Sequence, residues 1–284
     1  MPQRTFKKDV KLSIVGFGGI VVVGQTQENA NRDVARSVDR GVNYFDVAPS
    51  YGQGEAEEKL GIALEPYRDK SFLACKTQRR DAAGAREELE HSLKTLKTDH
   101  FDLYQLHAMS KMEDVDTVLG PGGALETFSK ARQEGKVKFL GFSAHNEDVA
   151  LRLLDEFEFD SVLFPINYVC MAQGQFGPRL LAKAKEKNVA RLALKALAYT
   201  PWASRQEKQS GHPKCWYKPI SDLDQARQAL RFTLSEDITA AIPPGDERVY
   251  RMAETLAAQF APLTPKERAA LLASSKDVTP LFRA

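Results

Sequence analysis

Four ionisable side chains lie at or just beyond the ends of three strand-like segments. VNYFDV ends in Asp46, SFLACK ends in Lys76, FDLYQLH ends in His107, and Tyr51 lies in the loop after the first of these segments. In a barrel of parallel strands, chemistry takes place at the carboxyl ends of the strands. Three successive strands therefore bring these four side chains to one mouth.

Such a set suits the delivery of a proton to a carbonyl oxygen. A ketone or aldehyde that accepts hydride becomes an alkoxide, and tyrosine, with an ordinary pKa of about 10, donates its proton reluctantly near neutrality. A nearby ammonium lowers that pKa, and a carboxylate holds the ammonium in place. We assign Tyr51 as the general acid, Lys76 as the group that lowers its pKa, and Asp46 as the partner of Lys76. His107 is expected to orient and polarise the carbonyl oxygen.

Each of these residues also has a purely structural interpretation. Asp46 and Lys76 could form an ion pair in the rim of a barrel, and Tyr51 could pack within the APSYG turn. A lone His107 could be a hydrogen-bonded core histidine. Their joint position at successive strand ends favours the catalytic interpretation.

The elements that position them alternate between strands and helices. Short apolar segments predict eight strands, namely KLSIVGF, VNYFDV, SFLACK, FDLYQLH, VKFLGFS, SVLFPIN, VARLALK and ITAAIP. Amphipathic stretches predict helices near residues 27–40, 54–66, 84–97, 123–134, 147–157, 178–187, 222–235 and 247–260. Helix stops are expected at Gly41, Gly135 and Asn188. This α/β pattern predicts one (β/α)8 TIM-barrel domain over residues 1–284, with irregular segments at 108–122, 199–221 and from 261 onward.

Composition narrows the class of partner. Forty basic and 38 acidic residues are interspersed and leave a net charge of +2, which argues against binding to duplex nucleic acid. No stretch is apolar enough for a transmembrane helix, and Cys75, Cys170 and Cys215 lack a disulfide or metal-site spacing. Glycines interrupt the apolar run near the N-terminus, so we expect a cytoplasmic protein rather than a secreted one. Metal ligands are not expected, and no oligomeric state is indicated.

The motifs around these residues resemble the aldo-keto reductase superfamily. GVNYFDVAPSYG, GEAEEKLG, LACKT, FDLYQLH and GFSAH follow one another in the order and spacing of that family, and the match extends from about residue 10 to 256. The resemblance implies a catalytic tetrad at Asp46, Tyr51, Lys76 and His107. The chemical argument selects the same four residues.

The resemblance also implies a nicotinamide cofactor across the barrel mouth, with NADPH favoured and NADH possible. The chain has no GxGxxG motif, and Gly18-Gly19 does not supply one. Arg248 would contact a phosphate beside a helix N-terminus, although an ordinary solvated arginine is equally compatible. The expected cofactor contacts are Gly19, Ile20, Ser143, Asn167, Lys195, Gly245, Arg248 and Glu254.

Some positions depart from the family pattern at the nicotinamide end. Ala144 and Leu163 replace an Asn and a Gln that are common there, and Leu194 stands where an aromatic side chain often stacks. Lys195 and Asn167 could compensate, although Lys195 could also belong to a rim ion pair. Strand eight ends in Pro243-Pro244-Gly245, without the Lys-Ser pair that many members use for a 2′-phosphate.

The leading functional hypothesis is an NAD(P)H-dependent carbonyl reductase or alcohol dehydrogenase that acts on a small-molecule carbonyl substrate. The alternative is a cofactor-binding regulatory or redox-sensing subunit with little turnover. A third class, a barrel lyase or isomerase, is disfavoured by the lack of metal-ligand clusters. Four residues of the 199–221 loop could line a substrate pocket or anchor the loop: Trp202, His212, Trp216 and Tyr217.

Overall fold

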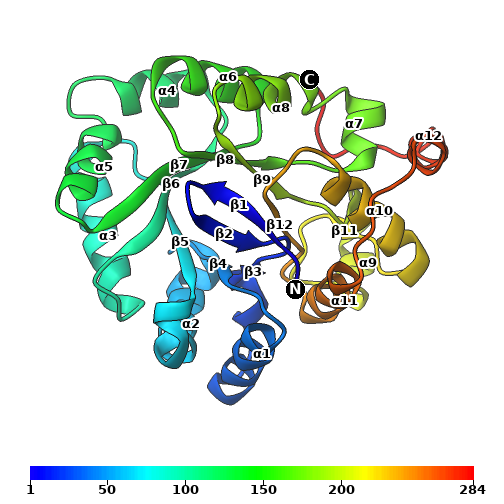
Figure 1. Cartoon of the computed structure of the whole chain (residues 1–284), viewed down its shortest axis with the longest axis horizontal. Coiled ribbons are helices and arrows are strands. Elements are labelled where there is room, and N and C mark those ends of the chain that lie inside the picture. Colours follow the sequence, from blue (N-terminus) through cyan, green and yellow to red (C-terminus); the bar gives the residue numbers. More distant parts are fainter.

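Eight parallel strands form the central barrel of the computed structural model, which describes residues 1–284 (Figure 1). In chain order they are β3 (Phe17–Gly18), β4 (Tyr44–Asp46), β5 (Phe72–Thr77), β6 (Phe101–Met109), β7 (Val137–Ala144), β8 (Ser161–Pro165), β9 (Ala190–Leu194) and β12 (Ala240–Ile242). Each pairs with the next, and a parallel bridge between Val15 and Ala241 links the last strand to the first. The predicted (β/α)8 barrel is confirmed.

Eight long helices surround the barrel. They are α1 (Gln27–Asp39), α2 (Glu55–Leu64), α3 (Ala82–Thr95), α5 (Ala124–Gln133), α6 (Glu147–Glu156), α8 (Pro178–Glu186), α10 (Leu223–Ser235) and α11 (Glu247–Ala258). All eight agree with the predicted helices to within a few residues. The three expected stops adopt left-handed backbone, with φ of +85° at Gly41, +75° at Gly135 and +53° at Asn188. The reversed backbone ends each helix and turns the chain toward the next strand.

The first segment differs from the prediction. KLSIVGF is not one barrel strand: its first residues lie in β2 (Val10–Ser13), which pairs with β1 (Gln3–Lys7) in an antiparallel hairpin, and only its residues from Val15 onward join the barrel. The hairpin lies across the end of the barrel where the strands begin (Figure 1). Its Phe6 ring lies 5.1 Å from that of Phe72 and 5.3 Å from that of Phe139. The hairpin therefore closes this end with apolar side chains.

The segments expected to be irregular contain α4 (Met112–Leu119), α9 (Arg205–Ser210), α12 (Pro265–Ser274) and most of the small pair formed by β10 (Ala198–Thr200) and β11 (Lys218–Pro219). Further short elements lie elsewhere in the chain: α7 (Tyr168–Gly174) and the 3-10 turns η1 (Gly19–Val22), η2 (Tyr51–Gly54) and η3 (Glu65–Lys70). None of the helices is both long and apolar enough to span a membrane.

Candidate active site at the barrel mouth

The structure brings together three of the four predicted catalytic groups by direct contact. The Lys76 ammonium donates a hydrogen bond to Asp46 Oδ1 and lies 3.3 Å from the Tyr51 hydroxyl. The fourth group, the His107 ring, lies edge-on to the Tyr51 ring with 5.6 Å between centroids. β4, β5 and β6 thus deliver the tetrad to one mouth, as predicted. The assigned roles of these residues remain predictions.

The Asp46 carboxylate has two further partners that the sequence argument missed. Gln105 Nε2 donates to Asp46 Oδ2 at 3.2 Å, and the Tyr44 hydroxyl donates to the same oxygen at 3.3 Å. Both side chains are fully buried inside the barrel. A buried charge needs such donors, and together they fix the carboxylate that holds Lys76. The alternation of inward-facing residues along β4 and β6 is the signal that could have identified them.

A strained turn presents Tyr51. After Tyr51 the backbone has positive φ at three successive residues: +62° at Gly52, +57° at Gln53 and +98° at Gly54. A Cβ at Gly52 would also approach Val23 to 2.9 Å. Glycine tolerates this conformation, whereas most side chains do not. The YGQG turn therefore connects the tyrosine to α2 without moving it from the mouth.

A bulge in β6 sets the direction of His107. The β6–β7 register shifts between Leu106 and Met109, and Ala108 has a φ of +56°. Ala108 N donates to Ser143 Oγ at 2.8 Å, and Arg80 Nη2 donates to the His107 carbonyl oxygen at 2.8 Å. Bulges beside active sites commonly redirect a side chain in this way.

The protonation states in the mouth follow from burial and from Lys76. Burial lowers the pKa of Lys76, but Asp46 and Tyr51 outweigh it, so the pKa is raised and the ammonium stays charged. Burial and the Lys76 charge hold the pKa of His107 well below its usual range, which leaves the imidazole neutral. Burial raises the pKa of Tyr51 and Lys76 lowers it, with burial prevailing. The expected lowering by Lys76 is thus only one contribution, and Tyr51 is protonated at neutral pH.

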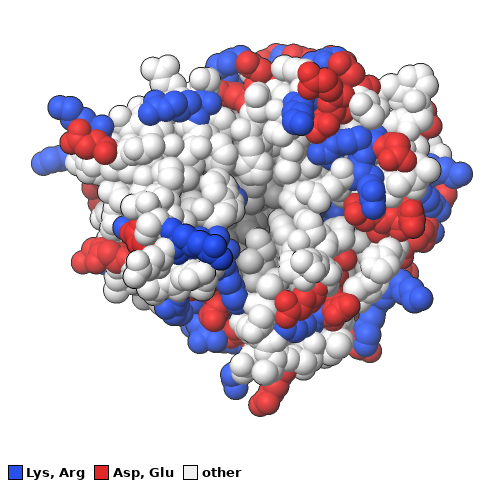
Figure 2. Space-filling model, turned by 180° about the vertical axis from the view of Figure 1, so that it is seen from behind, with Lys and Arg blue, Asp and Glu red and all other residues white.

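A small cavity of about 70 Å³ lies beside the tetrad, and the loop between β10 and β11 covers it. Figure 2 shows the face opposite the hairpin, which is hollowed near its middle. Residues from five parts of the barrel rim line the cavity: Gly18, Ile20, Asp46, Tyr51, Leu194, Lys195, Lys214, Cys215, Trp216, Tyr217, Ile242, Pro243, Pro244 and Gly245. Pockets for ligands usually measure about 300–1,000 Å³, so this cavity alone is too small to enclose a dinucleotide.

Several predicted cofactor contacts lie at this cavity. Ile20, Lys195 and Gly245 line it, and Gly19 is next to Ile20. A Cβ at Gly245 would lie only 2.4 Å from an Ile20 methyl group, so the two rim segments approach closely because residue 245 is glycine. Trp216 and Tyr217 line the cavity, whereas Trp202 anchors the loop by donating to the Cys215 carbonyl oxygen at 2.9 Å.

The side chains expected to hold a nicotinamide are suitably polar. Asn167 Oδ1 accepts from Cys170 N at 2.8 Å, but its buried Nδ2 has no partner. Ser143 is buried, and its hydroxyl accepts from Ala108 N while its own proton stays available. A carboxamide has the acceptor and donor that would satisfy these groups. Neither residue lines the small cavity, but their unpartnered polar groups suit the polar end of a nicotinamide.

Two predicted contacts are engaged elsewhere. Arg248 is bound to Asp246, at 2.9 Å, and to the Gly211 carbonyl oxygen at 2.7 Å, but its side chain is 61% exposed and remains accessible to a phosphate. Glu254 is buried between α1 and α11, with Arg40 Nε at 3.2 Å and Arg36 Nε at 3.6 Å. This placement does not favour a cofactor contact for Glu254, because its charge is already paired.

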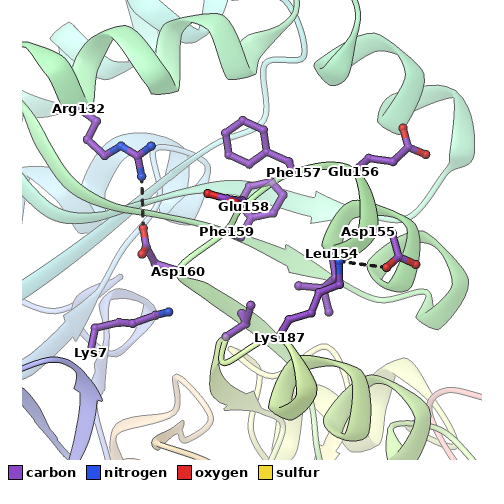
Figure 3. Close-up of a pocket in the computed structure, with 11 residues that line it drawn as sticks. Lys7, Arg132, Leu154, Asp155, Glu156, Phe157, Glu158, Phe159, Asp160 and Lys187 are labelled. Carbon is purple, nitrogen blue, oxygen red and sulfur yellow. Dashed lines mark ion pairs between the residues drawn. The ribbon is translucent and has the colours of Figure 1, made fainter.

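A larger hollow, of about 530 Å³, lies at the opposite end of the barrel (Figure 3). Its charged side chains neutralise one another: Arg132 lies 3.7 Å from Asp160, and Lys187 lies 3.1 Å from Asp155. It contains neither the tetrad nor an unpaired buried charge. Size alone therefore does not identify the functional site of this molecule.

Fold and site together define a (β/α)8 barrel with an Asp-Tyr-Lys-His set at its mouth. The family model described as "Aldo/keto reductase family" matches residues 15–273. The chain belongs to the aldo/keto reductase family, a family of oxidoreductases.

Individual relatives agree with this assignment. The chain is 26% identical over 296 residues to "Uncharacterized oxidoreductase YqkF" of Bacillus subtilis, with 94% of each chain covered. Its fold is similar to that of aldo-keto reductase AKR11C1 from Bacillus halodurans, with a TM-score of 0.76, 23% identity, and coverage of 99% and 98% of the two chains. A Klebsiella pneumoniae aldo-keto reductase solved in complex with NADPH gives a TM-score of 0.73 at 19% identity, with coverage of 100% and 98%.

Proposed function

We propose that the chain reduces small aldehydes or ketones to alcohols with NADPH or NADH, and that Tyr51 is the general acid. The contact between the Lys76 ammonium and the Tyr51 hydroxyl, 3.3 Å apart inside a carboxylate-anchored network, is the observation that carries this proposal. NADPH is the preferred cofactor in this proposal, by analogy with the NADPH complex of the Klebsiella relative.

The bound cofactor would supply the hydride to the carbonyl carbon. As the carbonyl π electrons move to oxygen, Tyr51 transfers its hydroxyl proton to that oxygen, and the product is a neutral alcohol. The nearby Lys76 ammonium stabilises the resulting tyrosinate, and Asp46 keeps the ammonium in position. The neutral His107 ring can donate one hydrogen bond to the carbonyl oxygen and so orient it.

The proposal is tested first by binding and then by turnover. Titration with NADPH and with NADH, followed by cofactor fluorescence, measures the two dissociation constants. Oxidation of the bound cofactor is then followed with an activated aldehyde such as 4-nitrobenzaldehyde. We expect Tyr51→Phe to lower kcat by at least about 100-fold, the lower range for general acid catalysis, without a large change in cofactor affinity.

Tyr67→Phe is the matched control, since Tyr67 lies in η3 before β5, at the end of the barrel away from the tetrad. It should behave like the wild type. Cofactor binding without turnover across a panel of aldehydes and ketones would instead support the regulatory-subunit alternative. Absence of binding to either cofactor at millimolar concentration would contradict both.

A further inference from the structure

Lys195 places an ammonium without a counter-ion at the barrel mouth. It follows β9 directly and has a φ of +64°, a conformation that costs free energy in a residue other than glycine. Its Nζ lies 5.4 Å from the centre of the Trp216 ring and 5.3 Å from that of Tyr217. The structure contains no ion pair or hydrogen bond to this Nζ. The interpretation of Lys195 as part of a rim ion pair is therefore wrong.

The surroundings of Lys195 contain positive charge but no free carboxylate. The pKa of Lys195 is lowered to about 8. Burial is the main cause, Cys215 opposes it, and the Lys76 ammonium adds to it. The nearby Asp46 charge is already committed to Lys76. Lys195 is partly buried, and its ammonium has no partner that would offset the loss of hydration. An anion supplied by a ligand would provide the missing partner.

The position of Lys195 relates it to the reacting end of the mouth. Burial lowers the pKa of His107, on β6, and of His145, which follows β7, and the Lys195 charge contributes to both shifts. The other lysine of the cavity, Lys214, is already bound to Glu247 and to the Val21 carbonyl oxygen, both at 3.0 Å. Of the two lysines that line this cavity, Lys195 is therefore the one without an anionic partner.

We propose that Lys195 binds a carboxylate on the substrate, so that the enzyme prefers aldehydes or ketones that carry a carboxylate over their neutral analogues. This inference rests on the proposed reductase function. A single ammonium between two aromatic rings matches one singly charged carboxylate on an apolar body, whereas a phosphate dianion requires more donors than this position offers.

Two substrates that share the same aldehyde and ring, one charged and one neutral, test the proposal: 4-formylbenzoate and its methyl ester. We expect the wild type to show a higher kcat/KM for the acid. Lys195→Met should lower the acid-to-ester ratio of kcat/KM by about 10- to 100-fold, the range for a hydrogen bond to a charged group. Lys195→Arg should restore part of the preference. In the wild type the preference should decline above pH 8, as Lys195 loses its proton.

Lys214→Met is the matched control, because it removes a second positive charge from the same cavity. It should leave the acid-to-ester ratio unchanged. An equal change of the ratio in both variants would overturn the proposal, since the preference would then reflect the general field. The proposal would also be overturned if Lys195→Met lowered kcat/KM equally for the acid and the ester and weakened cofactor binding. That result would assign Lys195 to the cofactor.

A binding measurement separates this inference from the proposed function. Benzoate and methyl benzoate are titrated into the protein while tryptophan fluorescence is recorded, because Trp216 lies beside Lys195. We expect saturable quenching by benzoate that Lys195→Met abolishes. If neither formyl substrate is reduced but this quenching occurs, the reductase function fails and the carboxylate site stands. Reduction of the ester without either acid preference or benzoate binding leaves the reductase and rejects the site.

Discussion

At the scale of single residues, the position of Lys76 depends on side chains that touch no reactant. Asp46 receives the Lys76 ammonium on one oxygen and Gln105 and Tyr44 on the other. Gln105 and Tyr44 are thus positioning residues for the proposed proton donor. Their effect reaches Tyr51 only through Asp46 and Lys76.

Replacement of Gln105 by Leu should lower kcat while leaving cofactor affinity unchanged. Loss of a hydrogen bond to a buried carboxylate costs about 1.5 kcal/mol, which corresponds to about tenfold in rate if it is felt fully in the transition state. Steady-state kinetics measures kcat, and fluorescence titration measures cofactor affinity. Gln78→Leu, at an exposed position, is the control. A parallel fall in cofactor affinity would indicate a general disturbance of the mouth instead.

The pH profile of reduction should lack an acidic limb caused by His107. Burial and Lys76 lower the pKa of His107 well below 6.5, so the ring is already neutral at pH 8 and stays neutral at pH 6. Tyr51 has a raised pKa and remains a proton donor over the same range. The ratio kcat/KM, measured with a neutral aldehyde, should vary little between pH 6 and 8. A limb near pH 6.5 that disappears in His107→Gln would contradict this.

At the scale of elements, the first turn of α11 joins the loop that covers the cavity. Asp246 caps this helix by accepting from Arg248 N and Val249 N, and it also pairs with His212 at 3.0 Å. Burial raises the pKa of Asp246, but hydrogen bonds from Arg248 and His212 prevail and lower it to about 2. One carboxylate therefore both begins the helix and holds the loop.

Asp246→Ala should destabilise the protein by about 1 kcal/mol through loss of the cap, and Asp246→Asn by less, because asparagine also caps helices. The part of this stabilisation that depends on the Asp246 charge is present above pH 3.9, about the pKa of an unfolded carboxyl group, and is lost as the pH falls toward 2. Urea unfolding at pH 7, 5 and 3 should therefore show the wild-type advantage over Asp246→Asn shrinking at low pH. An advantage independent of pH would show that the ion pairs add nothing.

The apolar periodicity of the sequence predicted the helices and strands better than it predicted the contacts between them. The long helices and the tetrad followed from apolar spacing and strand-end positions, because these depend on local sequence. The hairpin of β1 and β2 was missed because its apolar residues run directly into the first barrel strand. The burial of Glu254 and the engagement of Arg248 were missed because Arg36, Arg40 and the Gly211 carbonyl lie far away in sequence.

At the scale of the whole molecule, the hairpin contributes stability at the end of the barrel opposite the tetrad. Phe6 is 5% exposed and lies between Phe72 and Phe139. Phe6→Ala should lower the free energy of unfolding by about 3 kcal/mol, as for other buried phenylalanines, and leave cofactor affinity unchanged. Chemical denaturation measures the free energy of unfolding. Leu223→Ala, at an exposed position, is the control and should change that free energy by at most about 0.5 kcal/mol. A loss of cofactor binding in the folded Phe6→Ala variant would show that the two ends are coupled.

Packed side chains fill the barrel interior and the hairpin covers its far end, so the cavity beside the tetrad is reached from the mouth. A nicotinamide that reaches Asn167 and Ser143 enters by the same mouth as the carbonyl compound. Once both are bound, the carbonyl compound would lie between the nicotinamide and solvent. We expect an ordered kinetic mechanism, in which the reduced cofactor binds first and the oxidised cofactor leaves last. Product inhibition by the oxidised cofactor should accordingly be competitive against the reduced cofactor, whereas inhibition by the alcohol should not.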